Sequence, residues 1–204
     1  MDIVSKITFT QKQVEIIFNQ SKKLIVSKRI FRAFSLQEGQ SVDLRAYLPQ
    51  IAQAQQKEAL HSAFGYLTIR DRSTTEIQEA LRKKGYANSV AQAVLQELMA
   101  KGFVNDERFA NHFAQVRLQQ GYGKQRILQE LRQKGIESSI ATQALENIDY
   151  KEIAFLNACT IAQKYAKRYE DLSYTNKQKI IQALVRKGYS ISMAIKAVQS
   201  LQED

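Results

Sequence analysis

Few side chains in this sequence are suited to covalent or metal chemistry. The two histidines, His61 and His112, and the single cysteine, Cys159, lie too far apart to form a metal-ligand motif. Asp106 and Glu107 are adjacent acids, but they follow an asparagine of N-cap type and are expected in the first turn of a helix, where negative charge is favoured. The sequence has no glycine-rich phosphate loop, nucleotide fingerprint or nucleophile elbow. We therefore expect a binding protein and not an enzyme, with no cofactor or metal.

The remaining chemistry is that of positive charge. Lys and Arg number 30 against 20 Asp and Glu, which gives a formal net charge of +10 over 204 residues. Such a field attracts nucleic acid or an acidic protein surface, and the charge balance alone does not choose between them. The 44% hydrophobic content excludes a mostly disordered chain.

The position of each cation on its predicted helix suggests what it does. Two pairs are expected in the first turns of helices, namely Lys124 with Arg126 and Lys177 with Lys179. The helix dipole disfavours cations there, so this placement suits a helix end that binds phosphate or carboxylate with its free backbone N–H groups. Cations in last turns stabilise the dipole, and for these a structural role and a binding role both stay open: Arg82, Lys83, Lys84, Arg132, Lys134, Arg186 and Lys187.

Three tyrosines follow predicted turns beside basic residues, at Tyr86, Tyr122 and Tyr189. Such rings could stack on bases, as they do in proteins that bind single strands. We favour the alternative, in which each ring packs on the preceding helix, because this contact commonly accompanies a glycine cap.

These side chains are positioned by a sequence pattern that occurs three times. The first copy consists of Ser73, Ile77, Leu81, Gly85, Ser89, Val90, Ala91 and Leu95. Matching copies run from Gly123 to Leu145 and from Asn176 to Val198 with the same internal spacing. A fixed pattern of this length is typical of repeat proteins.

Each copy predicts two short helices joined by a tight turn. The first position holds an N-cap residue type, and Ser73 with Glu76 has the spacing of a capping box. The next apolar positions share one helical face, and a glycine then caps the carboxyl end, at Gly85, Gly135 and Gly188. A further helical stretch precedes each pair, so every unit should contain three helices.

The sequence therefore predicts a mainly α protein built of tandem three-helix repeats, at residues 50–104, 105–149 and 150–204. Units of this size bury too little apolar surface alone, so we expect them to stack in an elongated curved array.

The first 48 residues differ from the rest. Three β-rich runs, at residues 3–9, 14–18 and 24–26, predict a small amino-terminal β meander over residues 1–48. We expect this segment to have no hydrophobic bulk of its own and to be marginally stable, so it should either lean on the first helices or be an appended arm.

Four stretches together resemble the RecX family of RecA regulatory proteins. They are residues 66–73 (YLTIRDRS) with Glu76, Ile77 and Leu81; residues 102–110 (GFVNDERFA); residues 121–124 (GYGK) with Arg126 and Ile127; and Glu130-Leu131 with residues 134–136 (KGI). Members from Gram-positive bacteria are usually longer, so this chain is expected to be a short form or to lack part of the array.

The resemblance implies a cytoplasmic regulator of DNA repair, homologous recombination and the SOS response. Such a protein docks into the helical groove of the RecA filament on DNA and inhibits ATP hydrolysis, strand exchange and filament extension. The resemblance also adds Arg70 and Arg72, which lie in the first matching stretch, to the expected site. The full set of expected site residues is Arg70, Arg72, Arg82, Lys83, Lys84, Arg117, Lys124, Arg126, Arg132, Lys134, Lys177 and Lys179.

We expect the RecA filament as the main partner, with weaker electrostatic binding to single- or double-stranded DNA. The sequence lacks an apolar run long enough to span a bilayer, and its first ten residues lack the features of a secretory signal. We therefore expect a cytoplasmic monomer with no membrane association. The alternative is a direct DNA-binding protein, in which a helix of each unit enters a groove in helix-turn-helix fashion.

Overall fold

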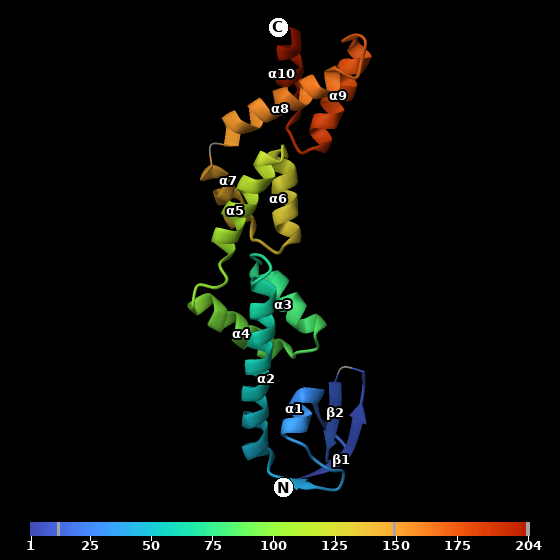
Figure 1. The fold of residues 1–204 in the computed structure, drawn as a ribbon, viewed down its shortest axis with the longest axis vertical. Coiled ribbons are helices and arrows are strands. Elements are labelled where there is room, and N and C mark those ends of the chain that lie inside the picture. Colours follow the sequence, from blue (N-terminus) through green and yellow to red (C-terminus); the bar gives the residue numbers. More distant parts are fainter. Residues whose placement is uncertain (12, 149, 203–204) are drawn as a thin grey trace. The chain divides into compact units, whose positions relative to one another are not determined.

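The computed structural model describes residues 1–11, 13–148 and 150–202 and divides into two compact units (Figure 1). The first unit spans Met1–Val104 and the second spans Asn105–Asp204. Asp149 and residues 203–204, which close the expected second and third repeats, lie outside the described residues.

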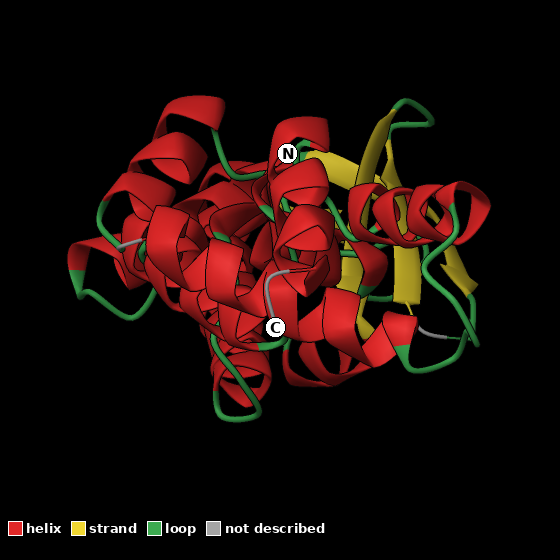
Figure 2. Ribbon diagram, turned by 90° about the horizontal axis from the view of Figure 1, so that it is seen from above, coloured by secondary structure: helices red, strands yellow, loops and turns green. Residues whose placement is uncertain are grey.

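An antiparallel sheet begins the first unit (Figure 2). Its strands are β1 (Asp2–Phe9), β2 (Gln13–Phe18), β3 (Lys22–Ser27) and β4 (Ser41–Val42), in the order β3-β2-β1-β4. The three expected strands are confirmed, and β4 is an addition to the expected three-stranded meander. Sequence reasoning missed β4 because two residues carry no alternation signal; they form a strand only by pairing with Asp2 and Ile3.

The sheet has an apolar core of its own, so the expectation of a segment without hydrophobic bulk is wrong. Alternation along β2 buries Val14, Ile16 and Phe18 on one face. The helix α1 (Lys28–Ala33) and the first turns of the next helix add to this cluster, the latter through Ile51. The expected contact with the first repeat helix is therefore confirmed.

From α2 onward, the described helices form three consecutive groups of three, which confirms the predicted repeats. The first group is α2 (Leu44–Leu67), α3 (Thr74–Lys83) and α4 (Asn88–Ala100). The second is α5 (Asp106–Gln119), α6 (Lys124–Gln133) and α7 (Ser138–Glu146). The third is α8 (Tyr150–Ala166), α9 (Tyr174–Arg186) and α10 (Ile191–Gln199), followed by the 3-10 turn η1 (Ser200–Gln202). Because α2 is continuous, the division expected between residues 48 and 50 lies inside one helix.

Local capping explains where several of these helices begin and end. The hydroxyl of Ser73 accepts from the backbone N–H of Glu76, and the Glu76 carboxylate accepts from the backbone N–H of Ser73, so the capping box is confirmed. The three cap glycines have left-handed backbones, with φ of 93° at Gly85, 75° at Gly135 and 93° at Gly188. Glycine adopts this conformation without steric cost, and this is why each helix stops there.

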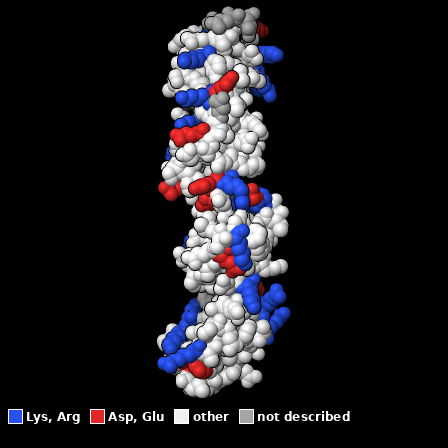
Figure 3. Space-filling view, turned by 90° about the vertical axis from the view of Figure 1, so that its left-hand side faces the viewer, with Lys and Arg blue, Asp and Glu red and all other residues white. Residues whose placement is uncertain are grey.

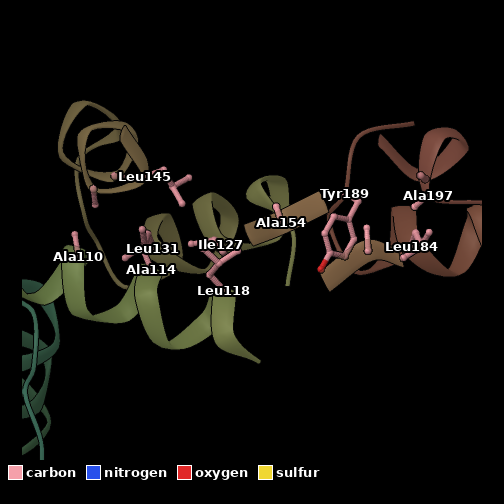
Figure 4. Close-up of a cluster of buried hydrophobic side chains, with 14 of the residues drawn as sticks. Ala110, Ala114, Leu118, Ile127, Leu131, Leu145, Ala154, Leu184, Tyr189 and Ala197 are labelled. Carbon is pink, nitrogen blue, oxygen red and sulfur yellow. The ribbon is translucent and has the colours of Figure 1, made fainter. Parts of the chain in front are cut away.

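Repeats 2 and 3 share one apolar core within the second unit. The cluster joins Leu118 of α5, Ile127 and Leu131 of α6, Ala154 of α8 and Leu184 of α9, all buried, and part of it is shown in Figure 4. Stacking is thus confirmed for these two repeats, whereas the elongated curved array stays a prediction. Among the described residues, no helix combines the length and the apolar character needed to cross a membrane.

Candidate basic binding surface

The first turn of α6 holds Lys124 and Arg126, as predicted, but its backbone N–H groups are not free. Oxygens of the third repeat accept from them: the N–H of Gly123 donates to the carbonyl of Lys187 at 2.9 Å, that of Lys124 to Tyr150 Oη at 2.8 Å, and that of Gln125 to the carbonyl of Gly188 at 3.0 Å. The expectation of an open, anion-binding end of α6 is therefore wrong, because these donors serve to join repeats 2 and 3.

The junction between these repeats leaves room only for glycine. A Cβ added to Gly123 would overlap the backbone of Gly188, and a Cβ added to Gly188 would lie 2.5 Å from the Cβ of Arg126. Sequence reasoning assigned both glycines to helix caps. The structure gives them a second role, in which two backbones approach each other directly.

Tyr189 anchors the same junction from inside the core. Its side chain is fully buried, and its Oη donates to the carbonyl of Gly121 at 3.0 Å. Burial raises the pKa of this phenol far above its ordinary value, because the phenolate would lose its hydration. The predicted packing role is therefore confirmed for Tyr189. Burial also raises the pKa of Tyr86, whose ring is half-buried with its Oη 3.4 Å from Ser62 Oγ.

Alkaline pH should destabilise the second unit through Tyr189. The pKa of the folded phenol lies above that of the unfolded chain, where tyrosine titrates near pH 10, so the native state keeps a proton that the unfolded state loses. Stability from this group is fully present below about pH 10 and falls above it, by less than the one-proton limit of about 1.4 kcal/mol per pH unit. The free energy of unfolding, measured by urea denaturation at several pH values between about 9 and 11, should fall less steeply with pH in Tyr189→Phe than in the wild type. An equal dependence on pH in the two proteins would contradict this.

An ion-pair cluster surrounds Tyr122 and includes two predicted site residues. Glu130 lies 2.7 Å from Arg117 Nε and 2.9 Å from Arg126 Nε. The first contact is an ion pair without hydrogen-bond geometry, and both of its atoms are buried. The guanidinium groups and Lys187 Nζ lie between 5.0 and 5.3 Å from the half-buried ring of Tyr122. These contacts favour an internal role for this ring over base stacking.

In the first repeat, the two arginines added by the resemblance have internal partners. Arg70 donates to both carboxylate oxygens of Glu76, at 2.9 and 3.0 Å, and these bonds raise its pKa. Arg72 Nε donates to the carbonyl of Tyr66 at 3.3 Å. The guanidinium of Arg72 and the ammonium of Lys84 each lie 5.4 Å from the centre of the Tyr66 ring. These cations therefore hold the turn between α2 and α3.

The third repeat departs from the prediction at the start of its middle helix. α9 begins at Tyr174 with Ser173 in the N-cap position that was predicted for Asn176, and the Ser173 side chain makes no capping hydrogen bond. The side chain of Asn176 instead donates to the loop before the helix. Lys177 and Lys179 are thus the fourth and sixth helical residues, beyond the first turn in which the dipole acts. The reason for assigning these two lysines to binding is therefore wrong.

The remaining predicted residues include exposed cations without internal partners in the part of the chain that the structure describes. Arg82, Lys83 and Arg132 lie exposed in the last turns of α3 and α6, as predicted, and the side chain of Lys124 is exposed as well. Within the described chain, none of these four side chains has an ion pair or hydrogen bond. Lys134 is different, since it is half-buried with its Nζ 5.4 Å from the centre of the Phe113 ring.

Sequence reasoning missed a group of cations in the second unit, namely Lys164, Arg168 and Lys187, which line one hollow. Only Lys187 had a signal, as a last-turn cation, and its position beside α8 depends on the tertiary fold. Figure 3 shows small groups of Lys and Arg, interspersed with acids, on the face that it presents. No cluster of His, Cys, Asp and Glu that could hold a metal ion is found in the described part of the chain.

Family models match each of the three helical repeats separately. The first RecX three-helix domain matches residues 59–98, the second matches residues 105–145 and the third matches residues 154–198.

Known relatives and solved structures give the same result. The chain is 33% identical over 146 residues to a "Regulatory protein RecX" of Legionella pneumophila strain Corby, and the matched region covers 70% of this chain and 96% of that protein. It is 29% identical over 191 residues to the "Regulatory protein RecX" of Bacillus licheniformis, covering 93% of this chain and 72% of that one. A crystal structure of regulatory protein RecX matches with a TM-score of 0.66 and 26% identity over 96% of this chain and 99% of that one. RecX from Lactobacillus salivarius matches with a TM-score of 0.69 and 25% identity over 74% of this chain and 99% of that one. With all three domains matched in order, the chain belongs to the RecX family.

Proposed function

We propose that this protein binds the RecA filament on DNA and inhibits its ATP hydrolysis, strand exchange and extension. The observation that supports this most strongly is the presence, in order, of the three RecX three-helix domains. The net charge of +10 supplies long-range attraction toward a filament that contains DNA. In this role the protein acts as a regulator by binding alone.

The internal contacts of the predicted site residues rank them for this role. Four of the predicted site residues are exposed and have neither an ion pair nor a side-chain hydrogen bond within the described chain, and these are our first candidates: Arg82, Lys83, Lys124 and Arg132. A free cation can pair with phosphate or carboxylate without breaking an internal bond. Arg70, Arg72, Arg117 and Arg126 come second, because each already has an internal partner. The other predicted site residues are Lys84, Lys134, Lys177 and Lys179.

The distribution of charge among the helices disfavours the helix-turn-helix alternative. In three-helix units of that type, the third helix enters the DNA groove and reads it. The third helices of the first two repeats, α4 and α7, contain no Lys or Arg, and α10 contains only Lys196. Seven of the twelve predicted site residues lie on the middle helices α3, α6 and α9, which favours a broad surface contact over groove insertion.

RecA-catalysed, single-strand-dependent ATP hydrolysis, measured with increasing amounts of this protein at two salt concentrations, tests the proposal. We expect inhibition that weakens as salt rises. Replacing both first candidates of α3, Arg82→Gln with Lys83→Gln, should raise the concentration for half-inhibition about fivefold, because each exposed pair contributes at most about 1 kcal/mol.

A variant with the same loss of charge provides the control. Lys22→Gln with Lys23→Gln removes two cations from the sheet, where they pair with Asp2 and Glu15. We expect its inhibition to stay within about twofold of the wild type. An equal loss in both variants would show that only net charge matters, and an absence of inhibition by the wild type would refute the proposed function.

A further inference from the structure

A hollow in the second unit gathers positive charge outside the predicted site. It has a volume of about 430 Å³ and lies between the carboxyl end of α5, the second half of α8 and the end of α9. Lys164, Arg168 and Lys187 line it, and its lining within the described chain contains no Asp or Glu.

The fold holds these cations in place from two directions. Thr160 and Lys164 are one helical turn apart on the same face of α8, and Arg168 continues the row in the turn that follows the helix. Lys187 comes from the junction between repeats, where its carbonyl accepts from the N–H of Gly123 at 2.9 Å. The hollow therefore depends on the packing of repeat 3 against repeat 2.

The charge in this hollow is not compensated internally. None of its three cations has an acidic partner within the described chain, whereas Arg117 and Arg126 share Glu130. Like charges that line one concave surface repel each other and focus their field into it. An anion in the hollow would relieve this repulsion.

We propose that the hollow binds the sugar–phosphate backbone of a single-stranded nucleic acid, with one nucleotide seated in it. Its volume falls in the range of roughly 300–1,000 Å³ that is typical of small-ligand sites, and one carboxylate side chain would fill only a small part of it. Tyr165 also lines the hollow, with the guanidinium of Arg168 4.7 Å from its ring centre. Aromatic rings and guanidinium planes are the groups on which unpaired bases stack.

This site is separate from the first candidates for filament binding, and the inference stands without RecA. Entry of a base into the hollow requires that the base be unpaired, so a duplex should bind there less well than a flexible strand. The two phosphates that flank the seated nucleotide would contact the cations of the hollow, which makes the contribution of the hollow visible in the salt dependence.

Binding of a fluorescein-labelled oligothymidylate to the full chain, followed by anisotropy over a range of salt, tests this proposal without RecA. Lys164→Gln with Arg168→Gln should raise Kd about tenfold and reduce the slope of log K against log salt by about 1.4, the value for two single-strand phosphate contacts. Lys187 is left unchanged because it also contacts Tyr122. The control, Lys151→Gln with Lys196→Gln, removes two other exposed cations of the same unit and should change Kd by less than about twofold.

Several outcomes would overturn the proposal. Equal effects of the two variants would mean that binding is diffuse, and tighter binding of a hairpin duplex than of the strand would exclude a seated base. If a labelled poly-glutamate peptide lost affinity for the variant while the oligothymidylate did not, the hollow would be a site for acidic protein segments.

The circular dichroism melting curve of each variant checks folding, and Lys164→Glu is a second variant that should weaken binding further. If the Lys164→Gln, Arg168→Gln variant still inhibits RecA but no longer binds the strand, the result supports this site. If the wild type binds the strand through the hollow but does not inhibit RecA, the result refutes only the proposed function.

Discussion

Replacing Gly188 by alanine should lower the free energy of unfolding of the second unit by about 3 kcal/mol, from roughly 1–2 kcal/mol of left-handed backbone strain and roughly 1–3 kcal/mol of overpacking. Gly188 has a φ of 93°, and its added Cβ would lie 2.5 Å from both the Cβ and the backbone nitrogen of Arg126. Neither of these atoms can move without shifting the start of α6. The N–H of Gln125, which donates to the carbonyl of Gly188 at 3.0 Å, would lose its partner.

Gly39→Ala is the matched control for this variant. Gly39 has a similar φ of 81°, but nothing lies within 4 Å of the position where its Cβ would be. The free energy of unfolding of Gly39→Ala should therefore fall by only about 1 kcal/mol, from the strain of the left-handed backbone. Urea unfolding followed by circular dichroism gives the loss, and hydrogen exchange of the first amides of α6 locates it. Equal losses in the two variants would show that the close contact between repeats contributes nothing.

Replacing Glu130 by alanine should cost about 2 kcal/mol, less than the 3–5 kcal/mol typical of a buried pair because the cluster is partly exposed. The side chain of Glu130 is 16% exposed and that of Arg117 is 31% exposed. Without the carboxylate, Arg117 and Arg126 would repel each other around Tyr122. The same two cations would become free for anions, so the affinity for an oligothymidylate should rise while stability falls.

Two further variants isolate the role of this pair. Glu97→Ala also removes one negative charge, but its partner Lys101 is 55% exposed, so unfolding should be little affected. Adding Arg117→Met to Glu130→Ala should restore at least half of the lost stability, since it removes the uncompensated cation and keeps its apolar packing. If Glu97→Ala and Glu130→Ala behaved alike in both urea unfolding and strand binding, Glu130 would have no special role.

Much of the local structure of this protein could be predicted from the sequence. Ser73 with Glu76 marked a helix start, and Gly85, Gly135 and Gly188 marked helix ends, because capping depends on residues within one turn. The start of α9 was misplaced because the side chain of Asn176, an N-cap residue type, donates to Asp171 in the preceding loop and does not cap the helix, which begins after Ser173.

The candidate site could be predicted only in part. Sequence position identified Lys124 and Arg126 as first-turn cations, yet it could not show that oxygens of the third repeat accept from the N–H groups of residues 123–125. The partner of Arg117 is Glu130, which lies on the next helix, and no spacing rule links them.

The sequence by itself determined the three-helix repeats, their caps and the excess of positive charge, because these follow from periodicity within a helix and from composition. Only the tertiary structure decided which cations are free. It joined repeats 2 and 3 through Gly123 and Gly188, paired Arg117 and Arg126 with the single carboxylate of Glu130, and left Lys164, Arg168 and Lys187 together in one hollow. The physical reason is that the availability of a charge depends on the groups within a few ångströms of it, and in a stacked repeat those groups belong to other helices and to the neighbouring repeat.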